Sequence, residues 1–189
     1  MKELLAQLEG YTPWNEQEER DRAVLLSMLR SGQDLWTREN ETAHLTASAW
    51  VTDPTRTKVL MCYHNIYRSW SWLGGHADGD RDLLAVALRE VGEESGLTSV
   101  RPVSEDLFSL EILTVDGHEK RGRYVPSHLH LNVTYLLEAD DAEPLAVKPD
   151  ENSAVGWFGL VEAVAASSEP WFRERIYTKL NAKLRARAN

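Results

Sequence analysis

Residues 75–97, GHADGDRDLLAVALREVGEESGL, decide how this chain is interpreted. A start rich in glycine and aspartate leads into a segment with the i, i+3, i+4, i+7 spacing of one buried helix face. The residues at this spacing are Leu84, Ala87, Leu88 and Val91. Gly96 is placed to end the helix, because glycine readily adopts the left-handed conformation found after helix C-termini. The sequence therefore predicts a loop over residues 70–80, followed by a helix from Leu83 to about Gly92.

Three carboxylates lie on a second face of this predicted helix. Glu90, Glu93 and Glu94 are neighbours on it, and like charges at such spacings cost roughly 0.2 to 0.5 kcal/mol per pair. They also lie near the C-terminal end, where the helix dipole disfavours anions. A bound hard dication such as Mg²⁺ would offset this repulsion, since it prefers carboxylate oxygens. The alternative is a solvated acidic helix end in which Arg89 pairs with Glu93.

The whole segment resembles the signature of the Nudix hydrolases. In that signature a glycine, five residues, a glutamate, seven residues, Arg-Glu, an aliphatic residue, any residue, Glu-Glu, any residue, a glycine and an aliphatic residue follow in order. Eight of the nine fixed positions match, namely Gly75, Arg89, Glu90, Val91, Glu93, Glu94, Gly96 and Leu97. The ninth is Arg81 in place of glutamate, and Asp80 or Asp82 is expected to cap the helix instead.

The resemblance covers roughly residues 43–165 and implies both a fold and an activity. The fold is the Nudix fold of the α/β (α+β) class, a mixed β-sheet sandwiched between α-helices. Two predicted strands, residues 44–51 and 58–63, would lead into Gly74 and Gly75. The implied activity is that of a pyrophosphohydrolase, which hydrolyses a diphosphate bond in a nucleoside diphosphate derivative or similar organic diphosphate. The implied cofactor is Mg²⁺ or Mn²⁺.

The resemblance also assigns roles to residues of the helix. Glu93 and Glu94 would bind the metal together with the Gly75 carbonyl, and Glu90 would either bind metal or deprotonate the attacking water. This agrees with general chemistry, in which metal ions neutralise a diphosphate and lower the pKa of bound water while a carboxylate takes the proton. Arg89 is expected to orient the carboxylates of its own helix.

One more carboxylate joins the candidate site. Glu151 precedes the strand-like residues 154–158, where some Nudix hydrolases place a further catalytic or metal-binding carboxylate. The alternative is a solvent-exposed acid. The predicted catalytic residues are Glu90, Glu93, Arg89 and Glu151, and the predicted metal ligands are Gly75, Glu90, Glu93 and Glu94.

Two other functions stay open at this point. A Nudix domain that senses a nucleotide without turnover is mildly supported by Arg81, although the intact three-glutamate cluster argues against it. An enzyme like the isopentenyl diphosphate isomerases would use Cys62 with histidines such as His44, His64 and His76. Residues 75–97 match the hydrolase form of the signature, and the Cys-containing motif of those isomerases is absent.

Further candidate binding residues lie downstream. His128 and His130 occupy one face of a predicted strand, residues 128–137, and would either contact substrate or form an exposed polar face. The basic residues Lys120, Arg121 and Arg123 precede this strand. They are candidates for contacting phosphates, and a solvated loop is the alternative.

Composition limits the partners and the compartment. The 189 residues carry a net charge of −9, so the average field repels nucleic acid and anionic membranes. One cysteine excludes an internal disulfide and suits a reducing compartment, and no apolar run approaches the roughly 20 residues of a membrane span. We expect a cytoplasmic protein that acts on a small-molecule diphosphate and binds neither nucleic acid polymers nor membranes.

Residues 1–42 are predicted to form an N-terminal helical extension. A short amphipathic stretch over residues 2–8 is followed by a break, and Asn15 is placed to cap a second helix that ends at Arg30. Residues 43–189 are expected to form the Nudix domain, including a basic amphipathic helix over residues 171–187. The extension would cover either a sheet edge or a partner subunit, and the second case corresponds to a homodimer.

Overall fold

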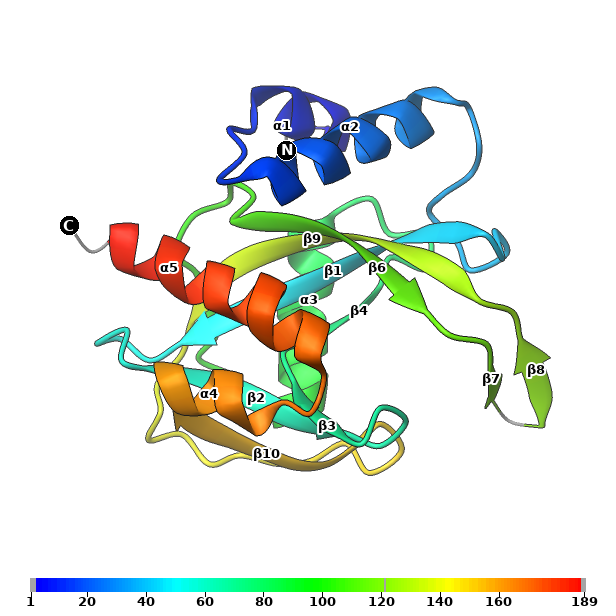
Figure 1. The fold of residues 1–189 in the computed structure, drawn as a ribbon. Coiled ribbons are helices and arrows are strands. Elements are labelled where there is room, and N and C mark those ends of the chain that lie inside the picture. Colours follow the sequence, from blue (N-terminus) through cyan, green and yellow to red (C-terminus); the bar gives the residue numbers. More distant parts are fainter. Residues whose placement is uncertain (1–2, 121, 188–189) are drawn as a thin grey trace.

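A computed structural model describes residues 3–120 and 122–187, built around an eight-stranded mixed sheet (Figure 1). At its centre β1 (Ala43–Thr52) runs parallel to β9 (His128–Glu138), in register from Ala43 opposite Leu129 to Thr52 opposite Glu138. The other pairings in this sheet are antiparallel. The predicted mixed sheet is therefore confirmed.

The remaining strands extend the sheet on both sides of this central pair. On the β1 side lie β2 (Lys58–His64), β3 (Ser69–Ser71), β4 (Leu73–His76) and β10 (Asn152–Gly159). On the β9 side lie β5 (Arg101–Pro102) and β6 (Ser109–Val115). A separate hairpin of β7 (His118–Lys120) and β8 (Arg123–Val125) projects beyond the sheet (Figure 1).

The expectation of a loop over residues 70–80 is partly wrong, because β3 and β4 occupy much of it. Glycine-rich sequence usually indicates a loop, yet Gly74 and Gly75 pair with Ser48 and Ala47 of β1. A Cβ added at Gly74 would lie 2.5 Å from the Ala47 carbonyl oxygen. Glycine is needed here for close approach of two backbones, and that is a known use of glycine within strands.

Helices cover both faces of the sheet (Figure 1). One core lies under α1 (Leu4–Gly10), α2 (Glu16–Arg30) and α3 (Leu83–Ser95). The other lies under α4 (Leu160–Ala166), the π-helical turn η1 (Phe172–Tyr177) and α5 (Thr178–Arg187). Alternate residues of β1 supply the two cores, Ala49 the first and Trp50 the second. Within the described ranges, no helix is both long and apolar enough to cross a membrane.

The predicted capping residues of α2 and α3 agree with the structure, while α3 continues to Ser95, beyond the predicted Gly92. Asn15 caps α2, its side-chain oxygen accepting the Glu18 N–H at 3.0 Å. Asp82 caps α3 by accepting the Ala85 N–H at 3.1 Å, and Gly96 follows the helix with a φ of 74°. Lys2, where the first helix was predicted to begin, lies outside the described residues.

A buried ion cluster joins α2 to α5. The fully buried Glu18 carboxylate lies 2.7 Å from Lys183 Nζ and 3.2 Å from Lys179 Nζ, and it accepts a hydrogen bond from the Ser109 hydroxyl at 2.9 Å. Burial alone would raise the pKa of Glu18, but the two ammonium groups outweigh it and hold the pKa below its ordinary value. Two basic residues of α5 are thus buried against α2 of the N-terminal helical extension.

Candidate active site

Gly75 of β4 lies directly against the carboxylate of Glu90 in α3. A Cβ added at Gly75 would lie 2.5 Å from the Glu90 carboxyl carbon, so a larger residue here would displace the Glu90 carboxylate. The pKa of Glu90 is raised, first by burial and then by the charge of Glu93. The structure therefore brings together two of the predicted metal-binding residues.

Glu94 is the most deeply placed carboxylate of the cluster. Glu94 is only 3% exposed, and its Oε2 accepts the Gly74 N–H at 2.9 Å. Burial raises the pKa of Glu94 to about 8, the Gly74 N–H opposes the shift, and the charges of Glu90 and Glu151 add to it. Burial therefore outweighs the Gly74 N–H and the positive charge of Lys148, both of which favour ionised Glu94.

Cys62 contacts this buried carboxylate. Its Sγ lies 3.9 Å from Glu94 Oε1, and burial followed by the Glu94 charge raises the pKa of the thiol. The thiolate is the reactive form of cysteine, so this environment does not activate Cys62. His64, another candidate for an isomerase-like site, lies instead beside the ring of Tyr67, with the two ring centres 4.5 Å apart.

Glu93 and Glu151 are linked by a lysine that sequence reasoning missed. Lys148 Nζ lies 2.7 Å from Glu93 and 3.0 Å from Glu151. Partial burial disfavours the charge on Lys148, but its bonds with the two carboxylates dominate and raise its pKa. Glu151 therefore lies near the carboxylates of α3, where a residue that takes part in the reaction would have to lie. Its predicted role stays a prediction.

The turn that carries Glu151 is fixed to the end of α3. The buried Asn152 side chain donates to the Glu94 carbonyl oxygen at 2.9 Å and accepts the Lys148 N–H at 3.2 Å. An amide that accepts from one segment and donates to another holds both in place. Asn152 therefore joins the turn of residues 148–152 to the C-terminal turn of α3.

The two arginines of the motif differ in surroundings. Arg89 lies 3.2 Å from Asp80 and 3.7 Å from Glu90, which suits the predicted orienting role. Arg81 stacks over the Trp36 ring, 5.0 Å from its centroid. Arg81 also lines a cavity of about 320 Å³ at the N-terminal end of α3, whereas the glutamates lie toward its other end.

The residues at this site fit a hard dication. Glu90, Glu93, Glu94 and Glu151 supply carboxylate oxygens, and these hard donors are what Mg²⁺ and Mn²⁺ prefer. Burial, and after it the charges of neighbouring carboxylates, raise the pKa of Glu90 and Glu94, so a bound cation would favour their ionised forms. The nearby Lys148 ammonium partly balances that charge and occupies the position of a cation between two of the four carboxylates.

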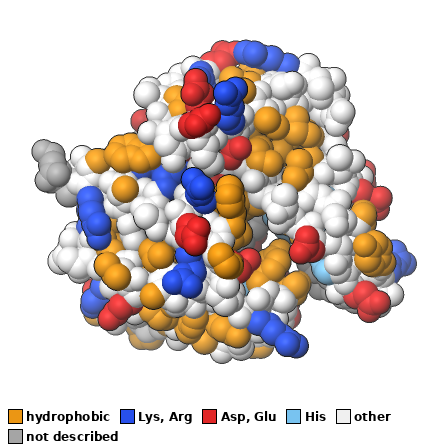
Figure 2. Space-filling view, viewed as in Figure 1, with side chains coloured by type: hydrophobic (Ala, Val, Ile, Leu, Met, Phe, Trp, Pro, Cys, Tyr) orange, Lys and Arg blue, Asp and Glu red, His pale blue; other side chains and the backbone are white. Residues whose placement is uncertain are grey.

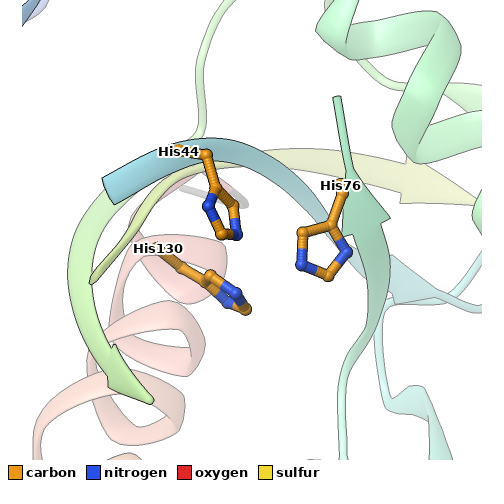
Figure 3. Close-up of side chains that lie close together, drawn as sticks. All are labelled: His44, His76 and His130. Carbon is orange, nitrogen blue, oxygen red and sulfur yellow. The ribbon is translucent and has the colours of Figure 1, made fainter. Parts of the chain in front are cut away.

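A second cluster, of histidines, lies on the other face of the sheet. His44, His76 and His130 each offer a ring nitrogen, and these nitrogens lie within 4.8 Å of one another (Figure 3). His128 adjoins them, its ring centre 4.8 Å from that of His44. Burial, followed by the neighbouring imidazoles, lowers the pKa of His130 to about 2.

Sequence reasoning divided these histidines between two different hypotheses. Their common face follows from the parallel register of β1 and β9, because His44 lies opposite His130. The alternation of polar residues along each strand was visible, but the pairing between strands was not. In the view of Figure 2, histidine surface borders a hollow, and acidic and basic side chains are interspersed around it.

The basic cluster is described only in part. Arg123 is exposed on β8, while Arg121 and the side chain of Lys120 lie outside the described residues.

Comparisons with known proteins give a family and a fold. The model of the NUDIX domain family matches residues 42–180, and no curated protein matches significantly. A C. elegans Ap4A hydrolase binary complex is 19% identical with a TM-score of 0.54, covering 76% of this chain and 96% of that chain. A NUDIX family hydrolase from Clostridium perfringens is 19% identical with a TM-score of 0.51, covering 76% and 97%. The E. coli dihydroneopterin triphosphate pyrophosphohydrolase is 16% identical with a TM-score of 0.52, covering 71% and 92%.

Proposed function

Because the chain belongs to the Nudix hydrolase family, we propose that it hydrolyses a diphosphate bond with the help of Mg²⁺ or Mn²⁺. The proposed substrate is a nucleoside diphosphate derivative or a similar organic diphosphate. Family membership, predicted from residues 75–97, is confirmed by the match over residues 42–180. The activity of this particular chain is the proposal.

One observation carries it, the convergence of four carboxylates from two segments beside Gly75. Glu90, Glu93 and Glu94 come from α3, and Glu151 comes from the turn before β10. A bound dication would neutralise the diphosphate and lower the pKa of a coordinated water. We assign Glu93, Glu94 and the Gly75 carbonyl to holding the metal.

The remaining residues position groups or move a proton. Glu90 has a raised pKa, so it takes up a proton more readily than an ordinary carboxylate, and it serves as metal ligand or general base. Glu151 serves as a further base or ligand. Arg89 contacts both Asp80 and Glu90 and thereby restricts the orientation of Glu90. Lys148 neutralises Glu93 and Glu151 when no metal is bound, so it competes with a dication for the same oxygens.

The test is a panel of nucleotides and other organic diphosphates with Mg²⁺ or Mn²⁺, read by mass spectrometry of the products. We expect hydrolysis that EDTA abolishes. Glu151→Gln should lower kcat by roughly 10² to 10⁴, the range for a positioned acid or base, with a much smaller effect on ligand affinity. The matched control is Asp150→Asn, because Asp150 is the adjacent exposed acid and should keep the wild-type rate.

Two results would contradict the proposal. Equal single-turnover rates for wild type and Glu151→Gln would exclude Glu151 from catalysis. Tight binding of a ligand that yields no product, with either metal, would instead identify the chain as a sensor of that ligand.

A further inference from the structure

We propose that the chain carries a second metal site, formed by His44, His76 and His130, which binds a transition-metal dication such as Zn²⁺. This site differs from the carboxylate site in ligand type and in position. It does not depend on the proposed hydrolysis.

The three histidines are positioned by the sheet itself. His44 of β1 lies directly opposite His130 of β9, and His76 of β4 lies opposite Thr46, two residues further along β1. Opposed residues, and residues two apart on a strand, share one face of a sheet. The three imidazoles therefore project from the same face, and Figure 3 shows the rings gathered in one space between the strands.

His44 has the hydrogen-bonding pattern of a metal ligand. Its Nδ1 lies 3.0 Å from the Asn40 carbonyl oxygen, and since a carbonyl only accepts, Nδ1 carries the proton and Nε2 keeps its lone pair. The residue is 4% exposed, and Nε2 has no hydrogen-bond partner among the described residues. Metal-ligating histidines characteristically donate one ring N–H to a carbonyl or carboxylate and offer the other nitrogen to the metal.

His128 orients His130 and is a candidate for a fourth position. Its Nδ1 lies 2.8 Å from the Pro126 carbonyl oxygen, so its Nε2 also keeps a lone pair. That Nε2 accepts the Nε2–H of His130 at 3.2 Å, so His130 carries its proton on Nε2 while no metal is bound. Two ligand nitrogens on a tetrahedral Zn²⁺ are roughly 3.3 Å apart, given metal–nitrogen distances of about 2.0 to 2.1 Å. The His128–His130 pair has a similar separation, and binding a metal through both Nε2 atoms requires His130 to move its proton to Nδ1.

Binding requires a modest contraction of the cluster. The ligand atoms of His44, His76 and His130 lie within 4.8 Å of one another. In a tetrahedral Zn²⁺ site the ligand nitrogens are roughly 3.3 Å apart. Rotation about the side-chain bonds can bring the three rings closer together without any movement of the strands. An ion would also give the buried Nε2 of His44 a partner, which buried polar atoms normally have.

The ligand set selects the kind of metal. Imidazole nitrogen suits Zn²⁺, Cu²⁺ and Ni²⁺, whereas Mg²⁺ prefers oxygen. Successive residues of a strand point to opposite faces, so Gly75 faces Glu90 and His76 faces the histidine cluster. The two sites therefore lie back to back across β4 and should load independently.

The test measures Zn²⁺ binding to the EDTA-treated, dialysed full chain in excess Mg²⁺, by competition with a chromophoric chelator. We expect one equivalent to bind, and His44→Gln to weaken binding by more than about 100-fold, because losing a group that merely supports a ligand already costs about 10- to 100-fold. His64→Gln, a histidine on β2 beside Tyr67, is the matched control and should bind as wild type does.

X-ray absorption of the wild-type Zn²⁺ complex provides a readout that needs no variant. We expect at least three imidazole ligands. An oxygen-only shell, no Zn²⁺ binding, or binding lost in Glu93→Gln and retained in His44→Gln would each overturn the proposal.

Discussion

Replacing Glu94 by glutamine should stabilise the metal-free protein while weakening its metal binding. The side chain is buried, and its pKa is about 8 in the folded protein against an ordinary value of 4.5. A glutamine oxygen can still accept the Gly74 N–H that Glu94 accepts at 2.9 Å, so the fold should be retained. The variant removes a carboxylate whose ionisation destabilises the folded protein.

The size and sign of the effect follow from this pKa shift. A carboxyl with a raised pKa takes up a proton on folding, so stability falls as pH rises from 4.5 to about 8. Each pH unit corresponds to about 1.4 kcal/mol, which makes the difference about 3 kcal/mol at pH 7 and about 5 kcal/mol above pH 8. Below pH 4.5 Glu94 is protonated in both states, and the difference vanishes.

The assay is urea unfolding of wild type and Glu94→Gln at pH 5, 6, 7, 8 and 9 in EDTA. Groups whose titration the substitution leaves unchanged cancel when the two unfolding free energies are subtracted. We expect the advantage of the variant to grow up to about pH 8 and then level off. Adding Mn²⁺ should narrow this advantage, because a ligand that binds only the folded state stabilises it by mass action and the variant binds Mn²⁺ more weakly.

A matched control is Glu93→Gln, the same change at a neighbouring side chain that is 45% exposed. It should not reproduce the steep pH dependence. Parallel wild-type and Glu94→Gln curves across this pH range would refute the reasoning, and unchanged Mn²⁺ affinity in the variant would remove Glu94 from the metal site.

Two further predictions concern residues outside the carboxylate cluster. Arg81→Ala should keep kcat/KM within roughly tenfold, about 1.4 kcal/mol, because Arg81 stacks on Trp36; a thousandfold loss in steady-state kinetics would show a direct role in the reaction. Glu18→Gln should lower the free energy of unfolding by roughly 3 to 5 kcal/mol, because it leaves Lys183 buried without its carboxylate, while Lys179 keeps Glu111 at 2.9 Å. Guanidinium unfolding measures this loss, and a change under about 1 kcal/mol would contradict it.

Local patterns made the fold and the α3 glutamates predictable. The apolar spacing of α3 and the alternation of β1 and β9 follow directly from helix and strand geometry. The motif indicated that Gly75 and Glu90 lie close together, as the structure shows, because they belong to one continuous segment. Their contacts are set by that segment and by the strand preceding it.

Contacts between distant segments were not predictable. Lys148 sits in an acidic, proline-containing stretch that has no periodic pattern, so its bridge from Glu93 to Glu151 had no sequence signal. The histidine cluster needs the register of His44 against His130, and that pairing is invisible in one sequence. A basic helix also normally indicates a solvated face, and the partner that buries Lys183 lies at the other end of the chain.

The ion cluster of Glu18, Lys179 and Lys183 makes the two ends of the chain a single cooperative unit. Glu18 and Lys183 are 165 residues apart in sequence, yet neither helix can detach without leaving buried charge on the other. Partial opening of proteins follows such cooperative units more closely than it follows sequence order. We therefore expect opening of α5 to be coupled to opening of α2, so that amide protons in both helices exchange through the same event.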